Sequence, residues 1–423
     1  MLAGALAAGL VLLAYGLLKP ARDAVFAAEG TGRELLWTGT FVGAVLLQPL
    51  WSALADRLTA RALLAWALRG AALGVLGGGV LLGLGEEHGP VGTHALREVP
   101  GSWWEGRWSQ EDTGWALTSG LQVWAERLFY VGLSIGNLLL VSVVWSALAR
   151  RFERLQARRL FGLVAAGASV GSLLGSSIVA LGGGALPTWA LALVGSLCLE
   201  GALRALHWVG AEGAPPRSGA LQGLGLLLRV PRLRGLALYV LLFTLGSTWL
   251  YFLTGRLVEE QLPEGPERVA YFARMQAWTS AATLAAQLFL SGRAMRSLGL
   301  GPTLAILPLL SMAGLAAVAT VPGLTALLWV NVVMGGARYA FARPGREALL
   351  AGAPRAQLFQ AKAALDTAVY RGGDLASAWL FAAAAGVASG GALAITALPA
   401  LALGAGLGLY LGRAGADDPA SRR

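Results

Sequence analysis

Long apolar segments recur from one end of the chain to the other, and charged residues, prolines and glycines gather between them. A helix that crosses a lipid bilayer needs about 20 mainly apolar residues. Cutting the sequence at its charged and Pro/Gly-rich positions leaves twelve such segments. They are 2–18, 36–55, 62–84, 120–147, 160–182, 187–208, 235–254, 271–290, 300–320, 324–342, 362–385 and 390–411. The pattern therefore predicts an all-α membrane protein with 12 transmembrane helices.

Arginines are concentrated in the connections on one side of the expected spans and in the tail. The opposite side has the loop 85–119, rich in Glu, Gly and Trp, and an acidic loop around 259–267. Short basic connections stay in the cytoplasm, so both termini are expected to be cytoplasmic, in a bacterial inner membrane. The basic positions are Arg57, Arg61, Arg150, Arg151, Arg154, Arg158, Arg159, Arg217, Arg229, Arg232, Arg234, Arg293, Arg296, Arg343, Arg346, Arg355, Arg413, Arg422 and Arg423.

The composition argues against several classes of protein. Of the 423 residues 56% are hydrophobic and 13% are charged, against about 25% charged in a soluble domain, which argues against a soluble enzyme. The net charge of +10 is mostly a topology signal, so no nucleic-acid partner is expected. The single Cys198 forms no disulfide framework. Glu86, Glu87, His88 and His94 lack fixed ligand spacing and fit a solvated loop better than a metal site. No catalytic motif occurs, so we expect neither an enzyme nor a cofactor.

The two halves of the chain resemble each other weakly. A basic stretch leads through Leu160-Phe161 into the fifth span, and another leads through Leu358-Phe359 into the eleventh. The connection 210–234 contains Pro215-Pro216 and is the natural linker. The expected domains are a six-helix bundle at 1–209, a cytoplasmic linker at 210–234, a second six-helix bundle at 235–412 and a cytoplasmic tail at 413–423. Two parallel six-helix bundles are the major-facilitator-like arrangement, in which the solute site lies near the middle of the membrane.

Charged residues inside expected spans are candidates for function, because a charge in hydrocarbon is costly. On the eleventh span Lys362, Asp366, Tyr370 and Asp374 recur every four residues, with Arg371 beside them. One interpretation is the wall of an anion-binding or proton-linked cavity. The alternative is local pairing, of Lys362 with Asp366 and of Arg371 with Asp374.

The tenth span ends in further charges. Arg338 lies deepest, and Pro344 is expected to stop the helix and leave Arg343, Arg346 and Glu347 at its mouth. Planar guanidinium groups there suit a phosphate or a carboxylate. Positive-inside anchoring with a salt bridge is the alternative for the last three.

Smaller groups of charges lie on other spans. Lys19, Arg22 and Asp23 follow the first apolar segment, where a snorkelling anchor and a gating or substrate role are both open. Glu126 and Arg127 are adjacent, point apart and so predict different partners. For these two and for Arg274 structural pairing is the alternative to coupling.

The fifth span carries Gly167, Gly171 and Gly175, four residues apart. No strand precedes them and no Lys-Ser/Thr pair follows, so they predict a close helix-packing face and not a phosphate loop.

Two segments, Trp124–Ser176 and Ala342–Trp379, resemble the corresponding regions of the ATP/ADP antiporter (nucleotide transporter) family and its bacterial relatives in the major facilitator superfamily. Leu18–Ala24 is similar to the motif that ends the family's first helix. The resemblance implies that Arg22, Arg346 and Lys362 bind phosphates, together with Asp366 and Arg371 of the eleventh-span motif. Leu133 stands where the exchangers carry an acidic residue, which argues against strict ATP-for-ADP exchange.

The sequence thus predicts a secondary-active transporter that moves an anionic solute by alternating access, with nucleotides and phosphorylated metabolites as candidate solutes. Its partners would be that solute, membrane lipids and a counter-ion, proton or exchanged solute, and we expect a monomer. The alternative is a lipid-handling or non-transporting sensory protein with the same bundle. The expected substrate-binding residues are Arg22, Arg338, Arg346, Lys362 and Arg371. The expected coupling or gating residues are Asp23, Glu126, Arg127, Arg274, Glu347, Asp366 and Asp374.

Overall fold

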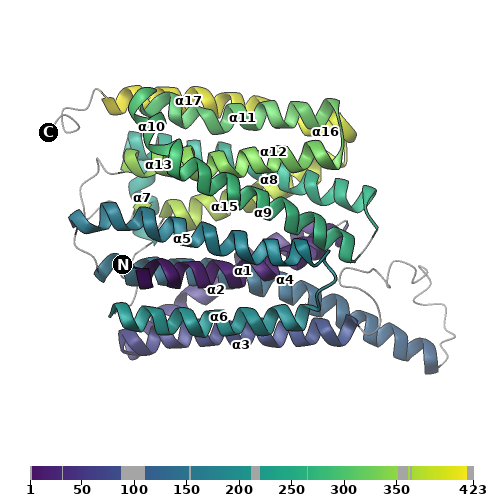
Figure 1. Ribbon diagram of the computed structural model, residues 1–423. Helices are drawn as coiled ribbons and strands as arrows, with labels where there is room; N and C mark the ends of the chain where they lie inside the picture. The colour runs from purple at the N-terminus through teal and green to yellow at the C-terminus, as the bar shows by residue number, and fades with distance from the viewer. Residues whose placement is uncertain are drawn as a thin grey trace. The chain divides into compact units, whose positions relative to one another are not determined.

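The chain was analysed as a computed structural model, and all of its regular structure in the described residues is helical (Figure 1). The described residues are 2–30, 32–86, 110–151, 154–210, 220–263, 265–350, 361–362 and 364–416. The predicted all-α class is therefore confirmed for this part of the chain.

Nine helical segments in the described residues are long and apolar enough to cross a membrane. They are Leu2–Ala28, Arg61–Gly83, Gln122–Leu148, Gly162–Leu181, Thr188–Val209, Pro231–Gln261, Leu300–Thr320, Leu324–Leu350 and Gly390–Arg413. The expected spans 36–55, 271–290 and 362–385 are largely helical but do not belong to this set. The protein is thus a multi-pass membrane protein, and the count of 12 remains a prediction.

The chain forms two compact units. Unit 1 contains Met1–Ala214 and Val258–Ala277, and unit 2 contains Pro215–Leu257 and Trp278–Arg423. The short segment 258–277, which the sequence division assigns to the second bundle, packs within unit 1.

Unit 1 is built around its first helix. Helix α1 packs mainly against α5 and α6, and α3 packs against α6 and α4. Small side chains such as Ala7, Ala14 and Ala202 are fully buried at these contacts, and they let the helices approach closely. The helices of this unit are α1 (Leu2–Ala28), α2 (Arg33–Arg57), α3 (Ala60–Glu86), α4 (Gln110–Arg151), α5 (Arg154–Leu181), α6 (Thr188–Val209) and the first half of α9 (Pro266–Phe289), whose second half belongs to unit 2.

The predicted glycine face of α5 is confirmed. A Cβ added to Gly171 would overlap the carbonyl oxygen of Gly9 on α1, and one added to Gly167 would lie 2.5 Å from the carbonyl oxygen of Ala5. Gly16 of α1 approaches Ser172 as closely, because its Cβ would lie 2.8 Å from the Ser172 carbonyl oxygen. The two backbones are therefore in direct contact, as glycines permit in membrane helices.

The first helix is longer than the sequence suggested. The expected end at residue 18 is wrong, because α1 continues through Pro20 to Ala28. A proline is tolerated inside a membrane helix where neighbouring groups supply the packing that the lost hydrogen bond removes. Here Leu18, Ala21, Ala24 and Phe26 are almost completely buried. Lys19, Arg22 and Asp23 therefore lie inside the helix and not beyond it.

Unit 2 packs α11 against α17, α16 and α12. Tyr239 of α8 is completely buried and donates a hydrogen bond of 2.7 Å to the carbonyl oxygen of Leu304 on α11. The elements of this unit are α7 (Ala220–Arg229), most of α8 (Pro231–Gln261), α10 (Ser291–Ser297), α11 (Leu300–Thr320), α12 (Leu324–Ala337), η1 (Arg338–Ala342), α13 (Arg343–Leu350), η2 (Leu365–Val369), α15 (Tyr370–Ala385), α16 (Gly390–Ile395) and α17 (Leu398–Ala416).

Two of these elements, η1 and η2, are π-helices. The Arg343 N–H donates to the carbonyl oxygen of Arg338, five residues back. The prediction that Pro344 stops the helix is wrong, because the helical segment runs on to Leu350. The wider turn changes the hydrogen-bond register just before the proline, so Pro344 enters the first turn of a new α-helical segment, where its missing N–H costs little.

Candidate functional site

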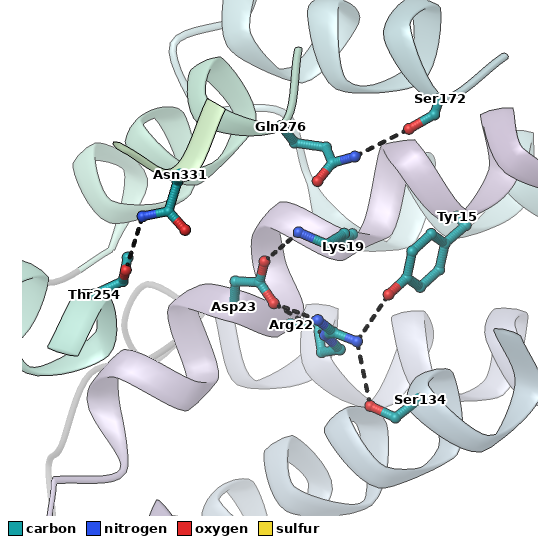
Figure 2. Close-up of polar contacts among 9 residues, drawn as sticks. All are labelled: Tyr15, Lys19, Arg22, Asp23, Ser134, Ser172, Thr254, Gln276 and Asn331. Atoms are coloured by element: carbon teal, nitrogen blue, oxygen red, sulfur yellow. Dashed lines mark hydrogen bonds and ion pairs between the residues drawn. The ribbon is translucent and has the colours of Figure 1, made fainter. Parts of the chain in front are cut away.

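A buried carboxylate on α1 is shared by two cations. Asp23 is 0% exposed and accepts from Lys19 Nζ at 2.7 Å. Arg22 reaches the other oxygen of Asp23, Oδ1, from Nη2 at 2.6 Å and from Nε at 3.0 Å. Figure 2 shows the three side chains meeting at the carboxylate. The group contains two positive charges and one negative charge.

The guanidinium of Arg22 is held on every side. Its Nη1 donates to the Tyr15 hydroxyl at 2.8 Å and to Ser134 Oγ at 3.4 Å (Figure 2). Its carbon also lies 5.7 Å from the centre of the Tyr15 ring and 5.3 Å from that of Tyr130, within cation–π range. Each nitrogen of Arg22 therefore has an acceptor, and two aromatic rings contact the cation.

The snorkelling interpretation of this group does not hold. The Lys19 side chain is 17% exposed and its ammonium is directed at Asp23, whereas a snorkelling lysine keeps its charged end in the water phase. The sequence alone could not show this, because it depends on α1 continuing past Pro20. A gating or substrate role for this group stays a prediction.

Among the described ion pairs of unit 1, two more join residues that lie far apart in the sequence and that sequence reasoning missed in part. Arg127 of α4 binds Glu29 at 2.6 Å, and Arg33 of α2 binds Glu259 at 2.5 Å. Because Glu29, Arg33 and Glu259 lie near the ends of apolar segments, they carried no signal beyond their charge. Arg127 therefore has a structural partner, as the pairing alternative expected.

The other two predicted coupling residues of unit 1 differ in burial. Glu126 is buried at 6% exposure. Arg274 is exposed, and its Nε donates to the carbonyl oxygen of Ala270 in its own helix at 3.3 Å.

In unit 2, η2 and the helical residues before it bind the charges of α13 through two ion pairs. Lys362 Nζ lies 2.6 Å from Glu347 Oε2, and Arg346 Nη2 lies 2.8 Å from Asp366 Oδ1. The expected local pair of Lys362 with Asp366 is wrong, because α13 supplies each of them with a partner of opposite sign at shorter reach. Two adjacent residues of α13, Arg346 and Glu347, thus bind two residues of opposite charge that lie four positions apart, Asp366 and Lys362.

Asp374 forms a second group in unit 2. Asp374 is buried, and its Oδ2 lies 3.4 Å from Arg371 Nη1. Its Oδ1 accepts a hydrogen bond of 3.5 Å from Thr248 Oγ1 of α8, and it interacts electrostatically with Arg338. The predicted pairing of Arg371 with Asp374 is confirmed. Arg343, by contrast, is exposed and outside both groups.

Two of the charged residues of unit 2, Arg338 and Asp366, lie in the π-helices. η1 begins at Arg338 and η2 contains Asp366. An α-helix turns about 100° per residue, so a repeat of four overshoots a full turn by about 40°. A π-turn, whose hydrogen bonds reach one residue further, reduces that drift between Asp366 and Tyr370. π-bulges inside α-helices occur frequently at functional sites.

Two of the arginines of unit 2 carry unsatisfied donors. Within the described part of the chain, the Nε atoms of Arg338 and Arg346 are buried and have no hydrogen-bond partner. A buried donor without an acceptor costs about 1–3 kcal/mol, so an anionic oxygen that reached either atom would be bound favourably.

Uncharged hydrogen bonds cross between helices in each unit. In unit 1, Gln276 Nε2 of α9 donates to Ser172 Oγ of α5 at 3.1 Å. In unit 2, Asn331 Nδ2 of α12 donates to Thr254 Oγ1 of α8 at 3.0 Å (Figure 2).

No group of three His, Cys, Asp or Glu side chains that could hold a metal ion occurs among the residues that the structure describes. The positions Glu87, His88 and His94, which the sequence analysis considered, lie outside those residues.

No protein-family model matches the sequence, and no curated protein is significantly similar to it. Solved structures of transporters are similar in fold. A crystal structure of the nucleoside transporter NupG superposes with a TM-score of 0.56 at 13% identity over 98% of both chains, and a point mutant of it gives 0.60 over the same shares. A POT family transporter in complex with 5-aminolevulinic acid gives a TM-score of 0.62 at 11% identity, over 98% of this chain and 96% of that one. The chain therefore shares the fold of these transporters.

Proposed function

We propose that this protein is a secondary-active transporter that moves a small anionic solute across the bacterial inner membrane by alternating access. The fold supports the transporter class, because the similar solved structures are transporters of nucleosides or other small solutes. The arginine-rich connections support 12 transmembrane helices with both termini in the cytoplasm.

The observation that carries the anionic solute is the balance of charge in the described groups of each unit. On α1, Lys19 and Arg22 both bind Asp23. In unit 2 the described group has four cations and three carboxylates. The cations are Arg338, Arg346, Lys362 and Arg371, and the carboxylates are Glu347, Asp366 and Asp374. Each of these sets contains one more cation than carboxylate, and a positive charge is costly in a membrane interior, so an anionic solute would be bound favourably.

Among anions, a nucleotide or another phosphorylated metabolite is the preferred class. Guanidinium groups bind phosphate oxygens through paired N–H donors, and Arg338 and Arg346 have buried donors to offer. The sequence resemblance to nucleotide transporters points to the same class.

The ion pairs of unit 2 provide a means of coupling. When an anion binds Arg346 or Lys362, it competes with Asp366 or Glu347 for the same cation, and the released carboxylate takes up a proton or finds another partner. Asp374, held by Arg371 and near Arg338, is the second such carboxylate. Return of the carboxylate to its cation then releases the solute.

The test is uptake into vesicles of phosphatidylethanolamine and phosphatidylglycerol that contain the purified protein. Labelled ADP, glucose 6-phosphate and citrate are compared with uridine as an uncharged solute. We expect uptake of at least one anion, little uptake of uridine, and at least a tenfold loss in Arg338→Gln and in Lys362→Gln. The exposed Arg413 of α17 provides a control variant, Arg413→Gln, with unchanged uptake.

Two results would count against the proposal. Undiminished uptake in both charge variants would remove these residues from the site. Movement of a labelled phospholipid between the leaflets, without uptake of any anion, would favour a lipid-handling protein.

A further inference from the structure

We propose that Lys19, and not Arg22, is the cation of α1 that contacts the transported anion, and that Arg22 is a positioning residue that holds Asp23. This inference rests on the proposed function. The sequence left an anchor and a gating or substrate role open for Lys19, and it predicted Arg22 as a solute-binding residue.

The first argument is a count of donors. An ammonium group has three N–H donors. For Lys19 one of them is used, by Asp23 Oδ2 at 2.7 Å, and no other partner occurs among the described residues. All three nitrogens of Arg22, by contrast, have acceptors. A solute oxygen adds a hydrogen bond at Lys19 but has to displace an existing one at Arg22.

The second argument is access. Two tyrosine rings, those of Tyr15 and Tyr130, lie within 6 Å of the Arg22 guanidinium carbon, and its side chain is 11% exposed. Lys19 has no ring over its ammonium in the described structure and is 17% exposed. An anion therefore meets Lys19 before it meets Arg22.

The third argument is the polarity of the surface beside Lys19. Gly16 lies three residues before Lys19, on the same side of α1, and a Cβ at Gly16 would lie 3.3 Å from the Ser172 Cα. Ser172 in turn accepts a hydrogen bond from Gln276. The face of unit 1 near Lys19 therefore carries a hydroxyl and an amide, which suit a polar solute and not a lipid chain.

The charge of the group gives Arg22 its role. Asp23 is completely buried, and a buried carboxylate without a cation is strongly unfavourable. Because Arg22 binds Asp23 through two nitrogens, the carboxylate stays ionised and in place when the solute draws Lys19 away. The ammonium is then free to move to the anion without leaving Asp23 unpaired.

The test compares variants at the two positions in the vesicle assay, with labelled ADP and labelled glucose 6-phosphate as probes. For the probe that the wild type transports, we expect Lys19→Gln to raise KM at least tenfold and to leave Vmax within twofold. Lys19→Arg, which keeps the charge, retains KM within threefold. Arg22→Lys keeps KM within threefold but lowers Vmax, because an ammonium cannot bridge Asp23, Tyr15 and Ser134 at once.

A chemical rescue guards against misfolding of a charge-neutral variant. Lys19→Cys is made together with Cys198→Ala, and the new thiol is modified either with an aminoethyl thiosulfonate, which restores an ammonium, or with methyl methanethiosulfonate, which does not. Mass spectrometry confirms the modification. Recovery of a low KM with the first reagent alone supports the proposal, and equal KM values after both reagents overturn it.

The outcomes separate the two claims. An unchanged KM in Lys19→Gln, or a KM that rises in Arg22→Lys as much as in Lys19→Gln, overturns the assignment of Lys19 and leaves the transporter intact. If the wild type takes up none of ADP, glucose 6-phosphate and citrate while uridine or a phospholipid crosses, the proposed function fails and this inference fails with it.

Discussion

The two units pair the charges of their helices in different ways. On α1, a single carboxylate with no exposed surface binds two cations, and Arg22 is also fixed by Tyr15 and Ser134. In unit 2, Lys362 pairs with Glu347 and Arg346 pairs with Asp366, and Arg346 also lies 4.0 Å from Glu347; the exposed side-chain fractions of Glu347, Lys362 and Asp366 are 39–43%. The group of Lys19, Arg22 and Asp23, called the α1 hub below, depends on one buried anion, so loss of that anion removes the partner that both cations share. In unit 2 two partly exposed carboxylates lie near Arg346, so a cation can exchange one carboxylate for another.

The largest effect on stability should follow removal of the Asp23 carboxylate, which both cations of the α1 hub bind. Asp23→Asn leaves Lys19 and Arg22 without their buried counter-charge, and breaking a buried ion pair on one side costs about 3–5 kcal/mol. We expect a strongly lowered unfolding temperature in detergent, measured by the loss of a monodisperse gel-filtration peak after heating. Asp366→Asn, at a half-exposed carboxylate of unit 2, is the matched comparison and should lower it much less. Equal shifts for the two variants would show that the two groups do not differ in the way described.

The exchangeable pairs of unit 2 should respond to reversal of charge. Lys362→Glu places a carboxylate beside Glu347, and Glu347→Lys places an ammonium beside Lys362, so each single variant should lose at least tenfold in uptake. The double variant restores opposite charges across the same 2.6 Å contact and should recover part of the uptake. Contacting residues show coupling energies of about 0.5–3 kcal/mol in such cycles. Additive losses would mean that the pair makes no energetic contribution.

The rigidity of the α1 hub should depend on the α1–α5 contact. Gly171→Ala forces a methyl group against the Gly9 carbonyl oxygen, and overpacking of this kind costs about 1–3 kcal/mol. Gly136→Ala on α4, where a Cβ meets nothing within 4 Å, is the control. We expect a lower unfolding temperature and slower uptake for the first variant only. If both variants behave as the wild type, close contact of α1 with α5 is not needed for the hub.

The smallest effect is expected at the pair of Arg127 and Glu29. The Arg127 side chain is 36% exposed, and partly exposed ion pairs contribute about 1 kcal/mol or less. Arg127→Gln should therefore shift the unfolding temperature by less than Gly171→Ala and should leave KM unchanged. A rise in KM would instead assign Arg127 to the solute path. The charged groups of unit 1 would then be less rigidly fixed than described above.

The sequence predicted the helices well and their ends poorly. The apolar segments marked the helical spans, and the four-residue spacing of Gly167, Gly171 and Gly175 predicted the packing face, because both signals are local. The end of α1 was missed because a charged stretch after a proline usually marks a boundary. Burial against α5 and α6 allowed α1 to continue instead.

The candidate site was predicted in its residues but not in its pairs. Each charge on the tenth and eleventh spans was identified because charges in apolar helices are rare. The partners of Lys362 and Asp366 were not, since residues four apart on a helix are a natural pair and the sequence gives no sign that α13 lies within 3 Å of both. The π-helices η1 and η2 likewise have no sequence signature, because their extra residue is accommodated by the hydrogen-bond ladder and by tertiary packing.

Those two π-turns bear on the genetics of the protein. Each holds one residue more than an α-helical turn would need, at 338–342 and 365–369. Loss of one codon in either stretch would remove that extra residue, restore α-helical hydrogen bonding and leave the helix on both sides close to its present orientation. The same loss in a regular α-helical stretch would rotate everything on one side of it by about 100°. In the coding sequence these ten codons are thus positions where a one-residue deletion is tolerated by the helix, and where a one-residue gap is to be expected when related sequences are aligned.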